Sequence, residues 1–202
     1  MKRTIILIGG MPTAGKTTIS RQVAKHFGLP LISGDQIRLI MQSVANQHEY
    51  PLLFNAEGLT AEEFLNKYTP EEIASMEYEQ GREVWLGVKN FVEHDWIWRK
   101  GCVIEGVSIL PDLVGNLDES KLNVKTVFLS DSDHERIRSV VYTRGLFNDA
   151  ASYSDSVKDI EIDWVKLFDK RLREDALAHN YPVIEIDKSE SDIEKVLAVL
   201  SS

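Results

Sequence analysis

The stretch Gly9-Gly10-Met11-Pro12-Thr13-Ala14-Gly15-Lys16-Thr17-Thr18 decides the fold of this chain. It follows a short apolar run, Thr4–Ile8, and leads into an amphipathic helical pattern. The eight residues from Gly10 to Thr17 match G-x-x-x-x-G-K-[ST], a loop whose backbone N–H groups bind phosphate oxygens. In such a loop the lysine reaches the β- and γ-phosphates, and the hydroxyl binds Mg²⁺. The stretch therefore predicts binding of ATP with Mg²⁺. The predicted nucleotide contacts are Gly10, Met11, Pro12, Thr13, Ala14, Gly15, Lys16, Thr17 and Thr18.

Further short apolar runs follow along the chain and are separated by helical patterns. They are Pro30–Ile32, Cys102–Glu105, Val124–Leu129 and Pro182–Ile186. Their length and β-branched content suit strands buried on both faces, and the helices between them suit parallel crossovers. We expect a single α/β domain over residues 1–202, with three layers and a mostly parallel five-stranded sheet.

Residues 35–100 interrupt this alternation and contain no strand pattern. The segment Pro70–Arg99 carries an apolar stripe at helical spacing, which predicts a helical insert over one side of the sheet, on the side of the phosphate acceptor. Its glutamates, Glu71, Glu72, Glu77, Glu79 and Glu83, are interpreted as a solvated face. Trp96 and Trp98 after the stripe are interpreted as packing residues.

The composition limits the possible partners. The formal net charge of -9 disfavours nucleic acid, so an anionic ligand has to be held by local donors. No apolar stretch approaches the roughly 18 residues of a membrane span, and the one cysteine, Cys102, suits a reducing compartment. We expect a cytoplasmic protein with no membrane partner. Nothing in the sequence indicates its oligomeric state.

Asp35 is the candidate catalytic base. It follows the second predicted strand, where the carboxyl ends of parallel strands border a ligand crevice. A carboxylate there can accept the proton of an acceptor hydroxyl and orient its oxygen toward the γ-phosphate. The alternative is a structural role, because Ser33-x-x-Gln36 is a capping-box pattern and an acid favours a helix N-terminus. Arg38, one helical turn later, could hold an anionic group of the acceptor.

Other charged residues complete the predicted site. Glu105 ends the third strand and is expected to support Mg²⁺ through water, with a buried structural acid as the alternative. Residues 144–155 lack apolar periodicity and are the candidate lid. Arg144 is the first candidate to neutralise the transferring phosphoryl group and Arg138 the second, whereas Arg136 is expected to pair on the surface. Arg82 and Arg99 are further candidate acceptor contacts.

These features favour a small kinase over other nucleotide-binding classes. The guanine-specifying Asn-Lys-x-Asp sequence of GTPases is absent, and the chain is short for a remodelling ATPase. Kinases of sugars, nucleosides, antibiotics or polynucleotide 5′-ends remain open as alternatives. A regulatory module that binds nucleotide without transfer is the alternative of another class, although such a module has no need of Asp35.

The chain also resembles 2-phosphoglycerate kinases. The likeness lies in residues 10–17, in Ser33-Gly34-Asp35-Gln36-Ile37-Arg38, in Val103–Pro111, in the stretch from Ile137 to Arg144 and in Tyr181–Glu185. The resemblance implies an ATP-dependent kinase with the P-loop NTPase fold of nucleoside-monophosphate kinases, strand order 2-3-1-4-5, and an acceptor that is a small hydroxylated anion such as 2-phosphoglycerate. Gly34 departs from the pattern, in which threonine or serine is expected.

Overall fold

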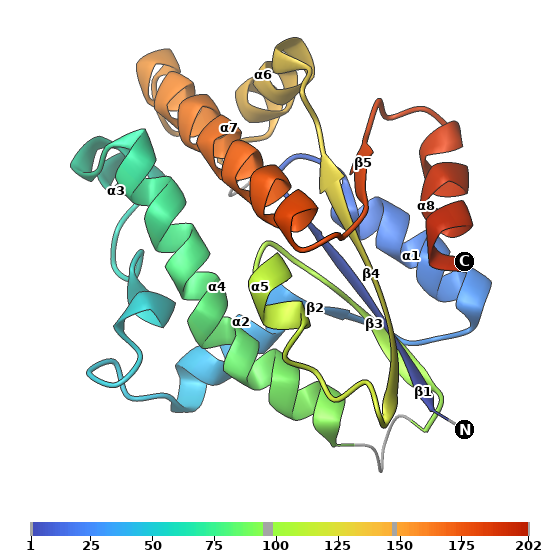
Figure 1. Cartoon of the computed structure of the whole chain (residues 1–202). Coiled ribbons are helices and arrows are strands. Elements are labelled where there is room, and N and C mark those ends of the chain that lie inside the picture. The colour runs from blue at the N-terminus through green and yellow to red at the C-terminus, as the bar shows by residue number, and fades with distance from the viewer. Residues whose placement is uncertain (1, 95–98, 147–148, 202) are drawn as a thin grey trace.

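A parallel five-stranded sheet forms the centre of the computed structural model, which describes residues 2–94, 99–146 and 149–201 (Figure 1). The strands are β1 Arg3–Gly10, β2 Leu31–Ser33, β3 Gly101–Glu105, β4 Leu122–Ser130 and β5 Val183–Glu185. Their order across the sheet is β2-β3-β1-β4-β5, and all four pairings are parallel. The predicted fold class and strand order are confirmed.

Two predicted strands begin one residue later than expected, and proline is the reason. Pro30 and Pro182 have no N–H to donate, so β2 and β5 start at the next residue. Both proline carbonyls still pair with the neighbouring strand: that of Pro30 accepts from the Val103 N–H at 2.9 Å, and that of Pro182 from the Phe128 N–H at 3.0 Å.

Helices cover both faces of the sheet and complete the three layers (Figure 1). One face carries α1 and α8, and the other carries α4, α5 and α7. The helical bounds are α1 Lys16–Phe27, α2 Gly34–Val44, the short 3₁₀ helix η1 Pro51–Phe54, α3 Ala61–Lys67, α4 Pro70–Glu93, α5 Pro111–Val114, α6 His134–Thr143, α7 Asp155–Ala178 and α8 Ser191–Ser201. The described part of residues 35–100 contains α2, η1, α3 and α4 joined by turns, while Trp96 and Trp98 lie outside the described residues. None of the described helices combines the length and the apolar character that crossing a membrane requires.

The interpretation of the α4 glutamates as a solvated face is wrong for two of the five. Glu71 and Glu72 are exposed in the first turn, and Glu72 closes a capping box with Thr69. The Glu79 side chain is 44% exposed and forms surface ion pairs with Arg82 and Arg171. Glu83 instead accepts a hydrogen bond from the backbone N–H of Leu53 at 2.8 Å, and Glu77 lies in the cavity described below.

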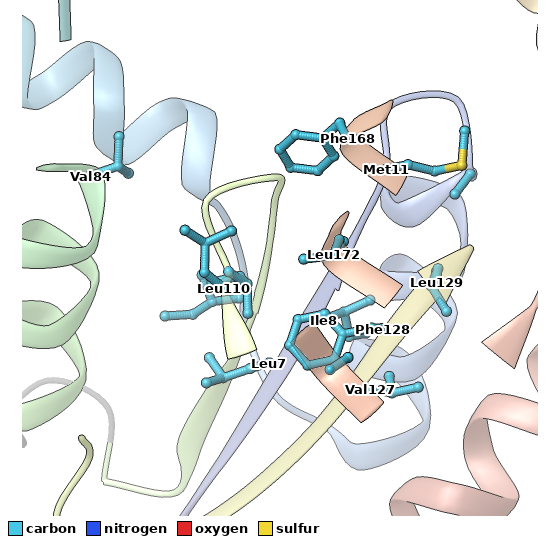
Figure 2. Close-up of a cluster of buried hydrophobic side chains, with 14 of the residues drawn as sticks. Leu7, Ile8, Met11, Val84, Leu110, Val127, Phe128, Leu129, Phe168 and Leu172 are labelled. Carbon is cyan, nitrogen blue, oxygen red and sulfur yellow. The ribbon is translucent and has the colours of Figure 1, made fainter. Parts of the chain in front are cut away.

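The hydrophobic core lies on both faces of the sheet, against α1 and α8 on one face and against α4 and α7 on the other, and Figure 2 shows a part of it. Residues 5–8 of β1 are fully buried, as expected for a central strand covered on both faces. Side chains from β1 and β4 gather there with Phe168 and Leu172 of α7 (Figure 2). This packing holds the carboxyl ends of β1 and β3 in fixed positions, and the candidate site is built on those ends.

Candidate active site

The phosphate-binding loop joins the end of β1 to the first turn of α1. Gly15, immediately before α1, has φ +74°, a left-handed conformation that favours glycine. Thr13 adopts a similar φ of +76°, which is rare for a residue with a Cβ and is typical of functional loops. The Lys16 ammonium group donates to the Met11 carbonyl at 2.7 Å. Burial lowers the pKa of Lys16 to about 8, although the carboxylates of Glu105 and Asp35 act in the opposite direction.

Thr17 and Glu105 meet directly beside this loop. The Thr17 hydroxyl donates to Glu105 Oε1 at 3.2 Å, and burial raises the pKa of Glu105. Strand register explains the meeting, because Glu105 is aligned with Ile8 of β1 on one side and with Ser33 of β2 on the other. A hydroxyl and a carboxylate are oxygen ligands of the kind that Mg²⁺ takes beside nucleotide phosphates. The donor set thus fits the predicted metal position.

Asp35 lies in the first turn of α2, but other side chains cap that helix. The Ser33 hydroxyl accepts from the Asp35 N–H at 3.2 Å, and Ser33 and Gln36 form the capping box. Within the described part of the chain, no hydrogen bond or ion pair engages the Asp35 carboxylate. The capping alternative therefore accounts for Ser33 and Gln36, and it leaves the Asp35 side chain free to face the cavity.

Gly34 explains how Asp35 comes so close to β3. A Cβ at Gly34 would lie 2.6 Å from Ser108 Oγ and 3.3 Å from the Glu105 carbonyl oxygen. The turn between β2 and α2 packs against the backbone after β3 with no room for a larger residue. The departure from the threonine or serine expected at this position thus has a steric reason.

A cavity of about 580 Å³ brings most of the predicted residues together. Its walls include the phosphate loop, the start of α2, the end of β3, part of α4 and the end of α6. The predicted residues on it are Pro12, Thr13, Gly15, Lys16, Thr17, Thr18, Asp35, Arg38, Glu105 and Arg144. Three cations and three carboxylates thus share this cavity, once Glu77 is counted.

Three predicted arginines lie elsewhere. Arg138 bonds Asp159 of α7 at 2.9 Å and stacks on Tyr142, so it faces away from the cavity. Arg82 is held by Asp112 and Glu79. Arg99 is exposed and lies two residues before β3, at the opposite edge of the sheet from Glu105. The expectation that these side chains reach the acceptor or the moving phosphoryl group does not agree with their placement.

Arg136 pairs with carboxylates, as expected, but one of its partners is buried. It binds Asp131, which is 1% exposed, and also donates to the Ile186 carbonyl at 3.0 Å. These bonds join the start of α6 to the end of β5 and give Arg136 a structural role.

The described part of the candidate lid, residues 144–146 and 149–155, is anchored at its base. Glu161 of α7 is fully buried and accepts from the Leu146 N–H at 2.7 Å and from the Tyr153 hydroxyl. Arg144 comes just before this anchor and donates to the Gly145 carbonyl at 3.2 Å. It forms no ion pair with any residue that the structure describes, so its charge is free to act on a ligand.

We expect Arg144→Ala to lower kcat by at least tenfold while changing the Kd for ATP by less than threefold. Its positive charge should be needed most as negative charge shifts onto the moving phosphoryl group, and such groups contribute to the transition state more than to binding. Single-turnover kinetics and calorimetry would measure the two quantities separately. Arg138→Ala is the matched control and should leave kcat and the Kd for ATP unchanged. Weaker ATP binding with normal kcat in Arg144→Ala would instead make Arg144 a ground-state contact.

The polar residues of the cavity that the sequence predictions missed include Glu77, Asn55 and Gln80. Asn55 follows η1, which is too short for a periodic signal, and the other two lie on α4 among similar polar residues. Burial raises the pKa of Glu77 to about 7, opposed by Arg38 and reinforced by Asp35. Only the packing of α4 over the sheet edge distinguishes Glu77 from the exposed glutamates of the same helix.

A second cavity, of about 650 Å³, lies on the other side of the phosphate loop. It is lined by the first turns of α1, by the segment between β5 and α8, including Ile186 and Lys188, and by the start of α8, including Ile193. It shares Gly15 and Thr18 with the first cavity. The phosphate loop therefore separates two spaces, which fits a site for two ligands that meet at the phosphates.

The fold is the three-layer P-loop NTPase fold, and it is similar to solved structures of small kinases. A gluconokinase from Sinorhizobium meliloti 1021 aligns with a TM-score of 0.52 and 15% identity, over 98% of this chain and 91% of that one. A shikimate kinase from Bacteroides thetaiotaomicron aligns with a TM-score of 0.50 and 16% identity, over all of both chains. No family model matches the chain.

At the level of sequence the chain is similar to 2-phosphoglycerate kinases, as its motifs predicted. The curated enzyme of Methanococcus maripaludis (strain C7) is 26% identical over 204 residues, and that of Methanopyrus kandleri is 27% identical over 205 residues. Both alignments cover 98% of this chain, but only 64% and 61% of the respective relatives. The chain thus spans less than two thirds of the length of these curated relatives.

Proposed function

We propose that this protein is an ATP- and Mg²⁺-dependent kinase that transfers the γ-phosphate to a hydroxyl of a small anionic metabolite, with 2-phosphoglycerate as the first candidate. The observation that carries the proposal is the convergence of Lys16, Thr17–Glu105 and an unengaged Asp35 carboxylate on one cavity. A protein that only binds nucleotide needs the first two features but not the third. Similarity to 2-phosphoglycerate kinases supports the choice of acceptor.

The roles follow from the positions of the side chains. Backbone N–H groups of the loop and Lys16 bind the phosphates, while Thr17 and Glu105 would hold Mg²⁺, which neutralises phosphate charge when bound. Asp35 accepts the proton of the acceptor hydroxyl and orients its oxygen. The base and sugar of ATP occupy the second cavity, because the first has to admit the acceptor.

Arg38 supplies the positive charge for an anionic acceptor. A charge-assisted hydrogen bond contributes about 1.5–3 kcal/mol, so Arg38→Ala should raise the acceptor's KM roughly ten- to a hundredfold and leave that of ATP unchanged.

A screen for ADP release over phosphorylated acids, sugars, nucleosides and oligonucleotides tests the proposed function. Preferred turnover of an uncharged sugar or nucleoside, insensitive to Arg38→Ala, would reject the anionic acceptor and retain the kinase. Nucleotide binding with no turnover of any compound would favour the regulatory module.

Glu77 opposes an anionic acceptor, and this opposition should depend on pH. With a pKa of about 7, Glu77 is protonated below pH 7 and becomes negative above it. We expect the acceptor's KM to rise roughly tenfold from pH 6 to pH 8, as a like charge appears beside the anion. Glu77→Gln should hold KM low across this range, whereas Glu71→Gln, on the exposed first turn of α4, should keep the pH dependence. An acceptor phosphate also titrates near pH 6, so the comparison is made between variants at each pH.

A different result would reassign the base. Loss of kcat in Glu77→Gln at every pH, with normal kcat in Asp35→Asn, would mean that Glu77 takes the hydroxyl proton.

A further inference from the structure

The side-chain amide of Asn55 has a fixed orientation. The Gln80 amide nitrogen lies 2.7 Å from the Leu52 carbonyl oxygen, so it is identified as the donor side of that amide. The same nitrogen lies 3.0 Å from the nearest Asn55 side-chain atom, which therefore has to be the oxygen. Gln80 is 4% exposed on α4, and its position is set by packing. Consequently the Nδ2 group of Asn55 is directed away from Gln80.

Four donor groups on residues that line this cavity have no partner in the described part of the chain: Asn55 Nδ2, Arg38 Nε, Trp164 Nε1 and the Thr13 hydroxyl, all shielded from water. Asn55 and Arg38 are the two that come from residues 35–100. A buried donor without a partner costs about 1–3 kcal/mol, and most buried polar groups in proteins are paired. Both residues line the 580 Å³ cavity. A group entering that cavity can therefore supply the missing partners once the side chains that shield the two atoms move aside.

The two donors come from neighbouring segments. The Gln42 side chain of α2 donates to the Leu53 carbonyl of η1, which joins the helix carrying Arg38 to the turn carrying Asn55. Arg38 and Ala56, the residue after Asn55, both also line an adjoining cavity between α2, η1 and α3. The two donors thus belong to the same end of the acceptor cavity, on the insert.

We propose that Asn55, positioned by Gln80, is a specificity-determining residue that binds the anionic group of the acceptor together with Arg38. Arg38 Nε and Asn55 Nδ2 donate to carboxylate or phosphate oxygens of that group. This inference rests on the proposed function and adds to it the second donor and the residue that orients it. Arg38 provides charge, while Asn55 provides a directed hydrogen bond that distinguishes an oxygen acceptor from a donor group.

Steady-state kinetics with 2-phosphoglycerate and ATP tests this proposal. Asn55→Ala should raise the KM for 2-phosphoglycerate about tenfold and change kcat and the KM for ATP by less than threefold. Gln80→Met keeps the side-chain length and removes the amide, so Asn55 loses its orienting partner, and the KM should rise by a smaller factor. Because Gln80 acts through Asn55, the double variant should be no worse than Asn55→Ala alone. Asn123→Ala is the matched control, since Asn123 lies at the start of β4, at the opposite edge of the sheet.

Each outcome separates this inference from the proposed function. Turnover of 2-phosphoglycerate with equal KM values in wild type and Asn55→Ala overturns the role of Asn55 and keeps the kinase. Additive effects of Gln80→Met and Asn55→Ala overturn the positioning role of Gln80. If wild type does not turn over 2-phosphoglycerate, the proposed acceptor fails. Calorimetry of 2-phosphoglycerate binding then tests the anion site by itself. Weaker binding in Asn55→Ala than in wild type supports that site, and equal binding or no binding rejects it. Glycerate and glycerol 2-phosphate, each carrying one of the two anionic groups, identify which group Asn55 contacts.

Discussion

We expect Lys16→Met to abolish measurable ATP binding in calorimetry and to leave the protein folded. Methionine keeps the length and apolar part of the side chain but removes the charge that contacts the β- and γ-phosphates. The fold should tolerate the change, because the loop retains its glycines and burial already disfavours the charged form of Lys16. Thermal unfolding of the variant should lie within a few degrees of wild type.

The pH dependence of ATP affinity provides a second measurement on Lys16. Burial lowers the pKa of Lys16 to about 8, and a bound triphosphate should raise this pKa again. Below pH 8 the lysine is already charged, so affinity is insensitive to pH. Above pH 8 binding requires uptake of a proton, and affinity should fall as much as tenfold per pH unit. Lys25→Met, on the exposed last turn of α1, is the control and should retain both affinity and its pH profile; unchanged affinity in Lys16→Met would contradict the phosphate-loop assignment.

The second large effect is expected for Asp35→Asn, which should keep ATP binding and lose turnover. Removal of a positioned base typically lowers the rate by about 10²–10⁴-fold. Asparagine preserves the shape, and the helix should not weaken, since Ser33 and Gln36 cap it. Rapid-quench measurement of phosphate transfer with saturating ATP and acceptor would isolate the chemical step.

Asp163→Asn is the matched control for Asp35, because Asp163 lies on the exposed surface of α7 and pairs only weakly with Lys166 at 3.8 Å. It should leave turnover and stability unchanged. Equal turnover in Asp35→Asn and wild type, with a loss of helical stability, would return Asp35 to a local structural role.

The sequence predicted the sheet edge of the site well, because parallel topology determines it. Once the loop after β1 was recognised, the carboxyl ends of β3 and β2 had to lie at the same edge of the sheet. Glu105 is the last residue of β3, and Asp35 comes two residues after β2. The same topology argues against Arg99 as an acceptor contact, since a residue just before β3 lies at the other edge of the sheet.

The lid side and the insert side of the site could not be predicted in this way. Helical spacing indicates that Arg138 lies on a helix that ends just before Arg144, but not that Asp159 and Tyr142 hold Arg138 outside the cavity. Likewise, Asn55 and Gln80 are 25 residues apart, and their meeting depends on how η1 packs against α4. Such contacts depend on tertiary packing between irregular segments, which local patterns do not encode.

The bond between the Lys16 ammonium group and the Met11 carbonyl has a consequence for the thermodynamics of nucleotide capture. A free lysine side chain loses up to roughly 2 kcal/mol of rotational freedom when a ligand orders it. Here the side chain is already confined across its own loop, so phosphate replaces one oxygen partner with another. Much of the ordering cost is met during folding rather than during binding. The entropy of ATP binding should therefore contain little contribution from this side chain, and the loop acts as a preorganised receptor.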